Sequence, residues 1–153
     1  MTALFKKLNL GTQSTVHVLN APGSFEPELA ALQGVTVKRS VSGSSSFAMA
    51  FVITRAQLDA ASHKLAAACT GDAILWMVYP KGTSQQYRCE FNRDSGWAIL
   101  GAAGFEPVRM VAIDADWSAV RFRRVEHIKS MSRDPGKSIS KAGKKKLRRG
   151  SKA

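Results

Sequence analysis

Cysteine is scarce in this chain: it has only two among its 153 residues, and neither belongs to a CxxC pair. Cys69 and Cys89 also have no cluster of histidines near them, so neither a structural zinc site nor a disulfide framework is predicted. We therefore expect no metal and a reduced, cytoplasmic environment. A body of about 128 residues needs no such support, because it can bury roughly two thirds of the surface that its unfolded form exposes.

Long apolar runs are missing as well. No stretch of 18 apolar residues occurs, which argues against a membrane-spanning helix. The N-terminal segment MTALFKKLNLG places two lysines early and follows them with no apolar stretch, so it does not resemble a signal peptide. We expect a soluble protein of the cytoplasm with no membrane contact.

The glycine motifs that bind nucleotides are absent. After the first expected strand, NAPGSF at 20–25 has a single glycine where the dinucleotide fingerprint G-x-G-x-x-G has three. The segment 80–83 lacks the upstream glycine of a phosphate loop. No nucleophile is recognisably paired with a base, and His17 lies in an apolar strand, where a core histidine is the expected interpretation. We therefore predict no cofactor, and the sequence favours a protein that is not an enzyme.

Acidic residues almost disappear at the C-terminal end. Residues 129–153 hold ten Lys and Arg against one acid, whereas residues 1–128 hold thirteen against ten, for a net charge of +12. The C-terminal segment mixes its cations with Gly and Ser and has few apolar residues, so it cannot bury enough surface to fold alone. We predict two parts: a folded domain at 1–128 and a basic, flexible tail at 129–153.

Within the body, apolar runs alternate with helical patterns. The runs 47–53 and 73–79 are continuously apolar and too short for buried helices, which is typical of strands covered on both faces. Thr54 and Gln57 form a capping box that begins a helix ending at Gly71. The other expected strands are 14–21, 35–38, 108–113 and 118–125, and the other expected helices run from Ser24 to Gly34 and from Asn92 or Asp94 to Gly104.

This alternation predicts an α/β fold. Strands that are separated by helices pair in parallel, with helices on both faces of the sheet. The short corner at 114–117 instead allows only an antiparallel hairpin. We therefore predict a single Rossmann-like, three-layer α/β domain with a mostly parallel sheet of about six strands and a C-terminal antiparallel hairpin. The strand at 35–38 is expected to have an exposed edge, through which two copies could pair.

Open α/β sheets bind ligands beyond the carboxyl ends of their strands. The candidate ligand-binding residues at these ends are Asn20, Lys81, Asp114, Asp116, Trp117 and Arg121. Each also has a structural interpretation, because strand ends need turn formers, and for Asp114 and Asp116 a role in the turn is favoured. One hypothesis is a small enzyme or ligand sensor, in which Lys81 and Arg121 hold an anionic metabolite or nucleotide and Asp114 or Asp116 acts as a base.

Five segments together resemble a known family. They are LFKKLNL at 4–10, LNAP at 19–22, LWMVYPK at 75–81, FNRDSGW at 91–97 and GFEPVRMVAIDADWSAVRFRR at 104–124. On these segments, which span nearly the whole body, the chain resembles the bacterial DUF3052 family of small proteins of unknown function. The resemblance implies a Rossmann-like fold similar to a trimmed methyltransferase core, and it implies no established catalytic residue. The motif positions that it carries over are Pro80, Lys81, Asp114, Asp116, Trp117, Ser118 and Arg121.

The tail suggests a second kind of function. Its candidate nucleic-acid-binding residues are Lys144, Lys145, Lys146, Arg148 and Arg149. Together they could contact about five phosphates through counterion release, with no reading of sequence. A solvated tail that only aids solubility explains the same charge. The leading hypothesis is a non-enzymatic binding module with a Rossmann-like core and a tail that contacts nucleic acid or another polyanion.

Overall fold

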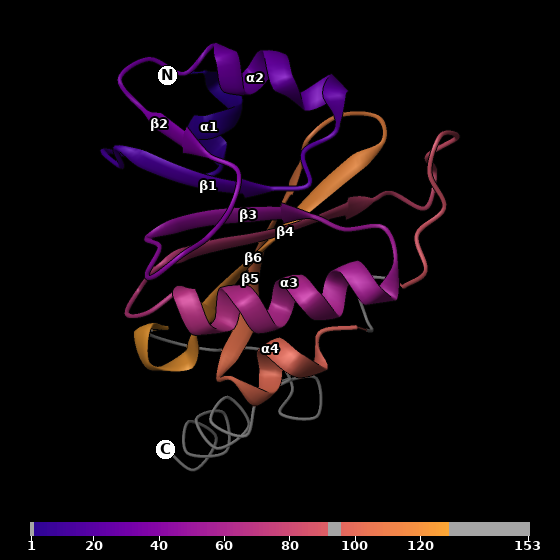
Figure 1. The fold of residues 1–153 in the computed structure, drawn as a ribbon. Coiled ribbons are helices and arrows are strands. Elements are labelled where there is room, and N and C mark those ends of the chain that lie inside the picture. Colours follow the sequence, from indigo (N-terminus) through magenta and orange to yellow (C-terminus); the bar gives the residue numbers. More distant parts are fainter. Residues whose placement is uncertain (1, 92–95, 129–153) are drawn as a thin grey trace, which may run out of the picture.

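The computed structural model of the chain describes residues 2–91 and 96–128. These residues form a six-stranded sheet with four α-helices packed around it (Figure 1). None of the described helices has the length and apolar character needed to cross a lipid bilayer. The predicted tail, and Asn92 and Asp94 as helix caps, lie outside the described residues.

The sheet has the strand order β2-β1-β3-β4-β6-β5. Four strands are parallel to one another: β1 (Thr15–Leu19), β2 (Thr36–Lys38), β3 (Phe47–Phe51) and β4 (Ile74–Pro80). Antiparallel pairing then joins β4 to β6 (Trp117–Arg124) and β6 to β5 (Phe105–Ala112). The predicted α/β fold with a C-terminal hairpin is therefore confirmed, and β2 lies at the edge of the sheet as expected.

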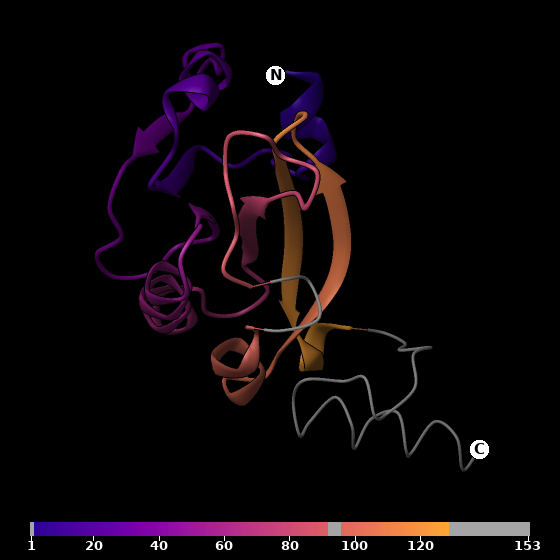
Figure 2. The ribbon, with the colours of Figure 1, turned by 90° about the vertical axis from the view of Figure 1, so that its right-hand side faces the viewer.

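The two central strands are covered on both sides. All five residues of β3 are buried, and so are all residues of β4 after Ile74. Helices α3 (Arg55–Ala68) and α4 (Ala98–Ala102) cover one face, and α1 (Ala3–Lys7) and α2 (Glu26–Ala30) cover the other (Figures 1 and 2). Each face has its own apolar core, because side chains alternate along a strand.

The longest helix, α3, begins as predicted. The backbone N–H of Gln57 donates to Thr54 Oγ1 at 3.1 Å, and Gln57 Oε1 accepts from the backbone N–H groups of Thr54 and Ile53. The predicted apolar positions, which are Leu58, Ala61, Leu65 and Ala68, are all buried against the sheet. The capping box and the apolar spacing therefore define this helix from the sequence alone.

The short helices differ from the prediction. Helix α1 was not expected. Helix α2 follows a 3₁₀ turn and starts at Glu26, so Ser24 does not cap it, and it ends at Ala30, short of Gly34. Helix α4 starts only at Ala98. Helices of five residues show no full apolar period, and docking of a few buried side chains such as Phe5 and Leu100 stabilises them.

Arg124 at the end of β6 joins the last strand to two helices. Its guanidinium donates to the carbonyl oxygens of Ala66 and Cys69 at 3.1 and 3.0 Å, and to that of Ala103 at 3.0 Å. It also lies 4.4 Å from the centroid of the Phe105 ring. Carbonyl groups at a helix C-terminus have no partner within the helix and carry partial negative charge. Arg124 therefore holds the ends of α3 and α4 against the sheet.

We expect Arg124→Met to lower the free energy of unfolding by about 2–3 kcal/mol, because Met keeps an apolar side chain of similar length and loses the charged hydrogen bonds. Urea unfolding followed by circular dichroism measures the change. Arg55→Met is the control: Arg55 is exposed and lies 3.8 Å from Asp59. Its loss should cost about 0.5 kcal/mol or less. Equal costs for the two variants would contradict the role of Arg124.

Candidate functional site

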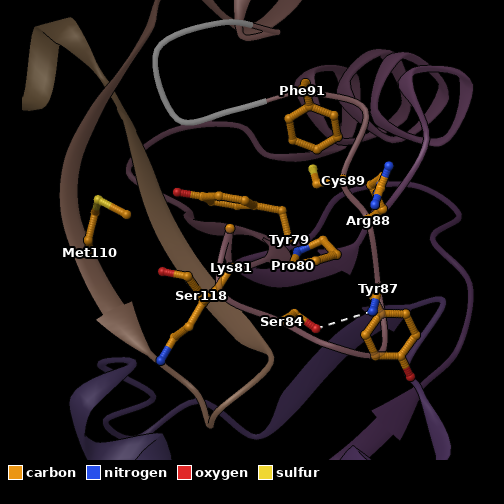
Figure 3. A pocket seen from close by; sticks show the side chains of 11 residues that line it. Tyr79, Pro80, Lys81, Ser84, Tyr87, Arg88, Cys89, Phe91, Met110 and Ser118 are labelled. Atoms are coloured by element: carbon orange, nitrogen blue, oxygen red, sulfur yellow. Dashed lines mark hydrogen bonds between the residues drawn. The ribbon is translucent and has the colours of Figure 1, made fainter.

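A cleft of about 520 Å³ opens beyond the carboxyl end of β4 (Figure 3). Strand β4 ends in Tyr79 and Pro80, and the loop that follows, 81–91, forms much of the wall. Met110 of β5 and Ser118 of β6 complete it from the hairpin. The residues that line the cleft are Tyr79, Pro80, Lys81, Gly82, Ser84, Tyr87, Arg88, Cys89, Phe91, Met110 and Ser118.

Hydrogen bonds hold the first half of the loop in place. The backbone N–H of Lys81 donates to the Asp116 carbonyl oxygen at 2.8 Å. Ser84 Oγ donates to Asp116 Oδ1 at 2.8 Å and accepts from the backbone N–H groups of Gln86 and Tyr87. Asp116 therefore positions the loop from the hairpin corner.

The other end of the loop is attached to the N-terminus of α3. The backbone N–H of Glu90 donates to the Ile53 carbonyl oxygen at 3.1 Å, and Glu90 Oε1 accepts from the backbone N–H of Arg55 at 2.7 Å. A carboxylate at this position stabilises the helix, because the first N–H groups of a helix lack partners and carry partial positive charge. Hydrogen bonds thus hold both ends of the loop 81–91, which forms much of the cleft wall.

The lining is aromatic and cationic. Tyr79, Tyr87 and Phe91 supply rings, and Lys81 and Arg88 supply positive charge, whereas no residue of the lining is acidic. In Figure 3 the Tyr79 ring lies between Ser118 on one side and Phe91 and Cys89 on the other. Such a surface can hold an anionic group and a flat ring together.

The cysteines are poor nucleophiles. Burial raises the pKa of the Cys89 thiol, and Glu90 raises it further, while a backbone hydrogen bond from Phe91 acts in the opposite direction. Burial raises the pKa of Cys69 to about 12 despite the nearby Arg124. Both thiols are therefore protonated at neutral pH, and the thiolate is the reactive form. Among residues 2–91 and 96–128, no three His, Cys, Asp or Glu side chains gather where they could bind a metal.

Asp114 belongs to the corner between β5 and β6. Its Oδ1 accepts from the backbone N–H groups of Asp116 and Trp117 at 2.8 and 2.9 Å, as a turn-forming aspartate does. Trp117 is 2% exposed and packs between Phe51 and Tyr87. Asp114, Asp116 and Trp117 therefore support the cleft from behind, and none of them lines it.

The remaining candidates are separated from Lys81. Asn20, with φ of 60°, lines a smaller groove of about 320 Å³ with Arg39, Gln57 and Lys64. Arg121 lies opposite Trp76 within the sheet. It therefore lies in the middle of β6 and not at the strand ends, where the ligand hypothesis had placed it beside Lys81. Ligand binding by any of these residues stays a prediction.

Sequence reasoning missed several lining residues. Tyr87, Arg88 and Phe91 lie in a connector whose return path cannot be read from the sequence. Met110 belongs to an apolar stretch of a predicted strand, so no sequence signal indicates that its side chain is 45% exposed. Ser118 was included only through the family resemblance.

Comparisons with known proteins give solved structures but no family. No family model and no curated protein matches this chain. The similar structures include the pyocyanin biosynthetic protein PhzM, at 16% identity and a TM-score of 0.48, over 78% of this chain and 52% of that one. They also include magnesium protoporphyrin IX methyltransferase (ChlM) from Synechocystis PCC 6803 with bound SAM, at 14% identity and a TM-score of 0.48, over 79% of this chain and 74% of that one. A SAM-dependent methyltransferase from Aquifex aeolicus matches at 14% identity and a TM-score of 0.49, over 80% of this chain and 88% of that one. The chain thus spans about half the length of PhzM.

The turn role of Asp114 predicts a specific pattern of stability. Asp114→Ala removes the acceptor of two backbone N–H groups and should cost about 1–2 kcal/mol in the free energy of unfolding. Asp114→Asn keeps an acceptor oxygen and should cost less than half as much. Urea unfolding of the three proteins checks this order. Equal stability of the alanine variant and the natural protein would argue that Asp114 does not build the corner.

Proposed function

We propose that this protein is a binding module, and that the cleft at the end of β4 takes a small anionic ligand that also carries a flat ring. The observation that supports this most directly is the composition of the lining, with two cations, three aromatic rings and no acid. A volume of about 520 Å³ is also within the range of small-molecule sites. A mononucleotide or an aromatic carboxylate has the required chemistry.

Binding without turnover agrees with the groups around the cleft. The cysteine of the lining is held as a thiol, and the oxygens of Asp114 and Asp116 that contact the corner and the loop already accept hydrogen bonds. A general base needs to reach the proton that it removes, and neither aspartate lines the cleft. The enzyme hypothesis with Asp114 or Asp116 as base is therefore the weaker one.

The family assignment also belongs to this proposal. On the segments given above, we propose that the chain is DUF3052-like. Two of the positions that this resemblance carries over, Lys81 and Ser118, line the cleft, and Asp116 hydrogen-bonds the loop that forms its wall. The resemblance and the geometry therefore single out the same corner of the fold.

A second candidate function rests on the charge of residues 129–153, which hold ten Lys and Arg against one acid. A segment of this charge attracts polyanions by releasing counterions, without reading their sequence. Association with nucleic acid through this segment is compatible with a small-ligand site in the cleft, since the two use different parts of the chain.

The cleft proposal predicts which ligands stabilise the protein. In a thermal-shift screen, nucleoside monophosphates and aromatic carboxylates should raise the melting temperature. S-adenosylmethionine should raise it less, because its net charge is positive and so is that of the lining. Lys81→Ala or Arg88→Ala should weaken a bound anion by about ten-fold, measured by titration calorimetry, since a charged hydrogen bond contributes about 1.5 kcal/mol or more.

Lys38→Ala is the matched control, because Lys38 is an exposed cation on the distant strand β2. It should leave the affinity unchanged. An affinity that falls equally in all three variants would indicate a general charge effect and argue against the cleft. Absence of binding by every anion of the panel would also contradict the proposal.

The tail hypothesis is tested in the full-length chain by replacing Lys144, Lys145, Lys146, Arg148 and Arg149 with glutamine. If these residues contact about five phosphates, the replacement should reduce the steepness of log affinity against log salt on duplex DNA by about 4.5. Fluorescence anisotropy with labelled DNA and RNA at several salt concentrations measures it. An unchanged affinity and slope would remove the tail from nucleic-acid binding.

A further inference from the structure

Three arginines share one face of the β5–β6 hairpin. Arg109 and Arg121 are directly paired across the two strands, and Arg123 follows Arg121 by two residues, so all three side chains leave the sheet on the same side. That side also carries Val111 and Trp117, which belong to the core under α1 and α2. The cleft is on the opposite side, where Met110 and Ser118 lie. We name Arg109, Arg121 and Arg123 the arginine face.

Arg121 is the central residue of this face and lacks a counterion of its own. It is half-buried beside Trp76, whose indole N–H donates to the Leu8 carbonyl oxygen at 3.0 Å. Its Nε atom is buried and has no hydrogen-bond partner among the described residues. Burial, helped by the charges of Arg123 and Arg109, lowers the pKa of Arg121, and only Asp72 opposes this. A half-buried cation between two others is unfavourable unless an anion joins them.

The acids near the arginine face are already in use. Asp72 accepts from Arg123 Nε and Nη2 at 2.7 and 2.6 Å, which occupies both carboxylate oxygens. Glu106 stands opposite Arg123 in the strand register and is fully buried. Arg109 is exposed, and among the described residues its guanidinium donates to the neutral amide oxygen of Asn9 at 3.3 Å and forms no salt bridge. Arg109 and Arg121 thus remain available to an external anion.

The cationic surface of the described residues continues beyond one end of the hairpin. Asn9 follows α1, whose last turn holds the exposed lysines Lys6 and Lys7, and α1 lies beside the end of β5 (Figure 2). At the other end, β6 leads through Val125–His127 to Ile128, the last described residue. In the sequence, the basic segment 129–153 starts six residues after Arg123.

We propose that the arginine face is a docking surface for the phosphate backbone of nucleic acid. A guanidinium offers a planar pair of donors that matches a phosphate group, and Arg109 and Arg121, which are paired across the two strands, can contact neighbouring phosphates. Contacts to phosphates carry no sequence information, so binding through this face is not sequence-specific. The inference extends the second candidate function to the folded domain, and it is independent of the ligand of the cleft.

The test uses the full-length chain and fluorescence anisotropy with a short labelled DNA duplex and a labelled single-stranded RNA, between about 0.05 and 0.2 M salt. Arg109→Gln/Arg121→Gln should weaken binding to at least one of them by about ten-fold. On the duplex, it should reduce the steepness of the salt dependence by about 1.8, since each lost phosphate contact accounts for about 0.9. Lys38→Gln/Arg55→Gln removes two charges from exposed positions on β2 and α3 and is the matched control, with an expected change below about two-fold.

The single variant Arg109→Gln separates a loss of binding from a loss of folding, because Arg109 is exposed. It should lower the affinity for nucleic acid less than the double variant does and leave the melting temperature unchanged. If the arginine variants lose no more affinity for nucleic acid than the control variant does, the proposal is overturned. So would an absence of binding to both nucleic acids, or equal binding of polyglutamate, which would indicate an acidic protein partner. Failure of the tail hypothesis is a separate result, because only the variant with five tail cations replaced by glutamine tests that hypothesis.

Discussion

Burial of β3 and β4 on both faces is the constraint on which the rest of the structure depends. Strands without a wet face need an apolar layer on each side, so helices must cross the sheet above and below it. Such crossovers make β1, β3 and β4 parallel neighbours, which brings their carboxyl ends to one edge. The cleft beyond Tyr79 and Pro80 lies at this edge, and Glu90 attaches its loop to the first turn of α3.

The antiparallel hairpin then divides its side chains between two surfaces. Along β5 and β6, alternate residues face opposite sides, so Met110 and Ser118 reach the cleft while Arg109 and Arg121 leave the sheet on the other side. The pairing of Tyr79 with Ser118 sets the register for both. A register shift of one residue would exchange the two sets and destroy both surfaces. One hairpin therefore couples the geometry of the cleft to that of the arginine face.

The sequence predicted the parts of the fold that have a strong local signal. Continuous apolar runs defined β3 and β4, and the capping box at Thr54 defined α3. Helix α1 could not be predicted, since contacts from distant segments stabilise it. In the candidate site, Lys81 was found from its place after a buried strand, whereas Arg88 lies in a loop whose return depends on Glu90. Arg121 was misplaced because it lies in the middle of β6, opposite Trp76, and not at a strand end.

The use of acidic side chains explains how a body of modest net charge can present cationic surfaces. Residues 1–128 hold ten acids against thirteen Lys and Arg. Several of these acids have structural roles: they are Glu26, Asp72, Glu90, Asp114 and Asp116. These contacts occupy the carboxylates away from the cleft lining and from Arg109 and Arg121, so they leave both cationic surfaces without an acidic partner. Lys81, Arg88, Arg109 and Arg121 lack a salt bridge among the described residues. An external anion is therefore the partner that the charge distribution of this fold favours at both surfaces.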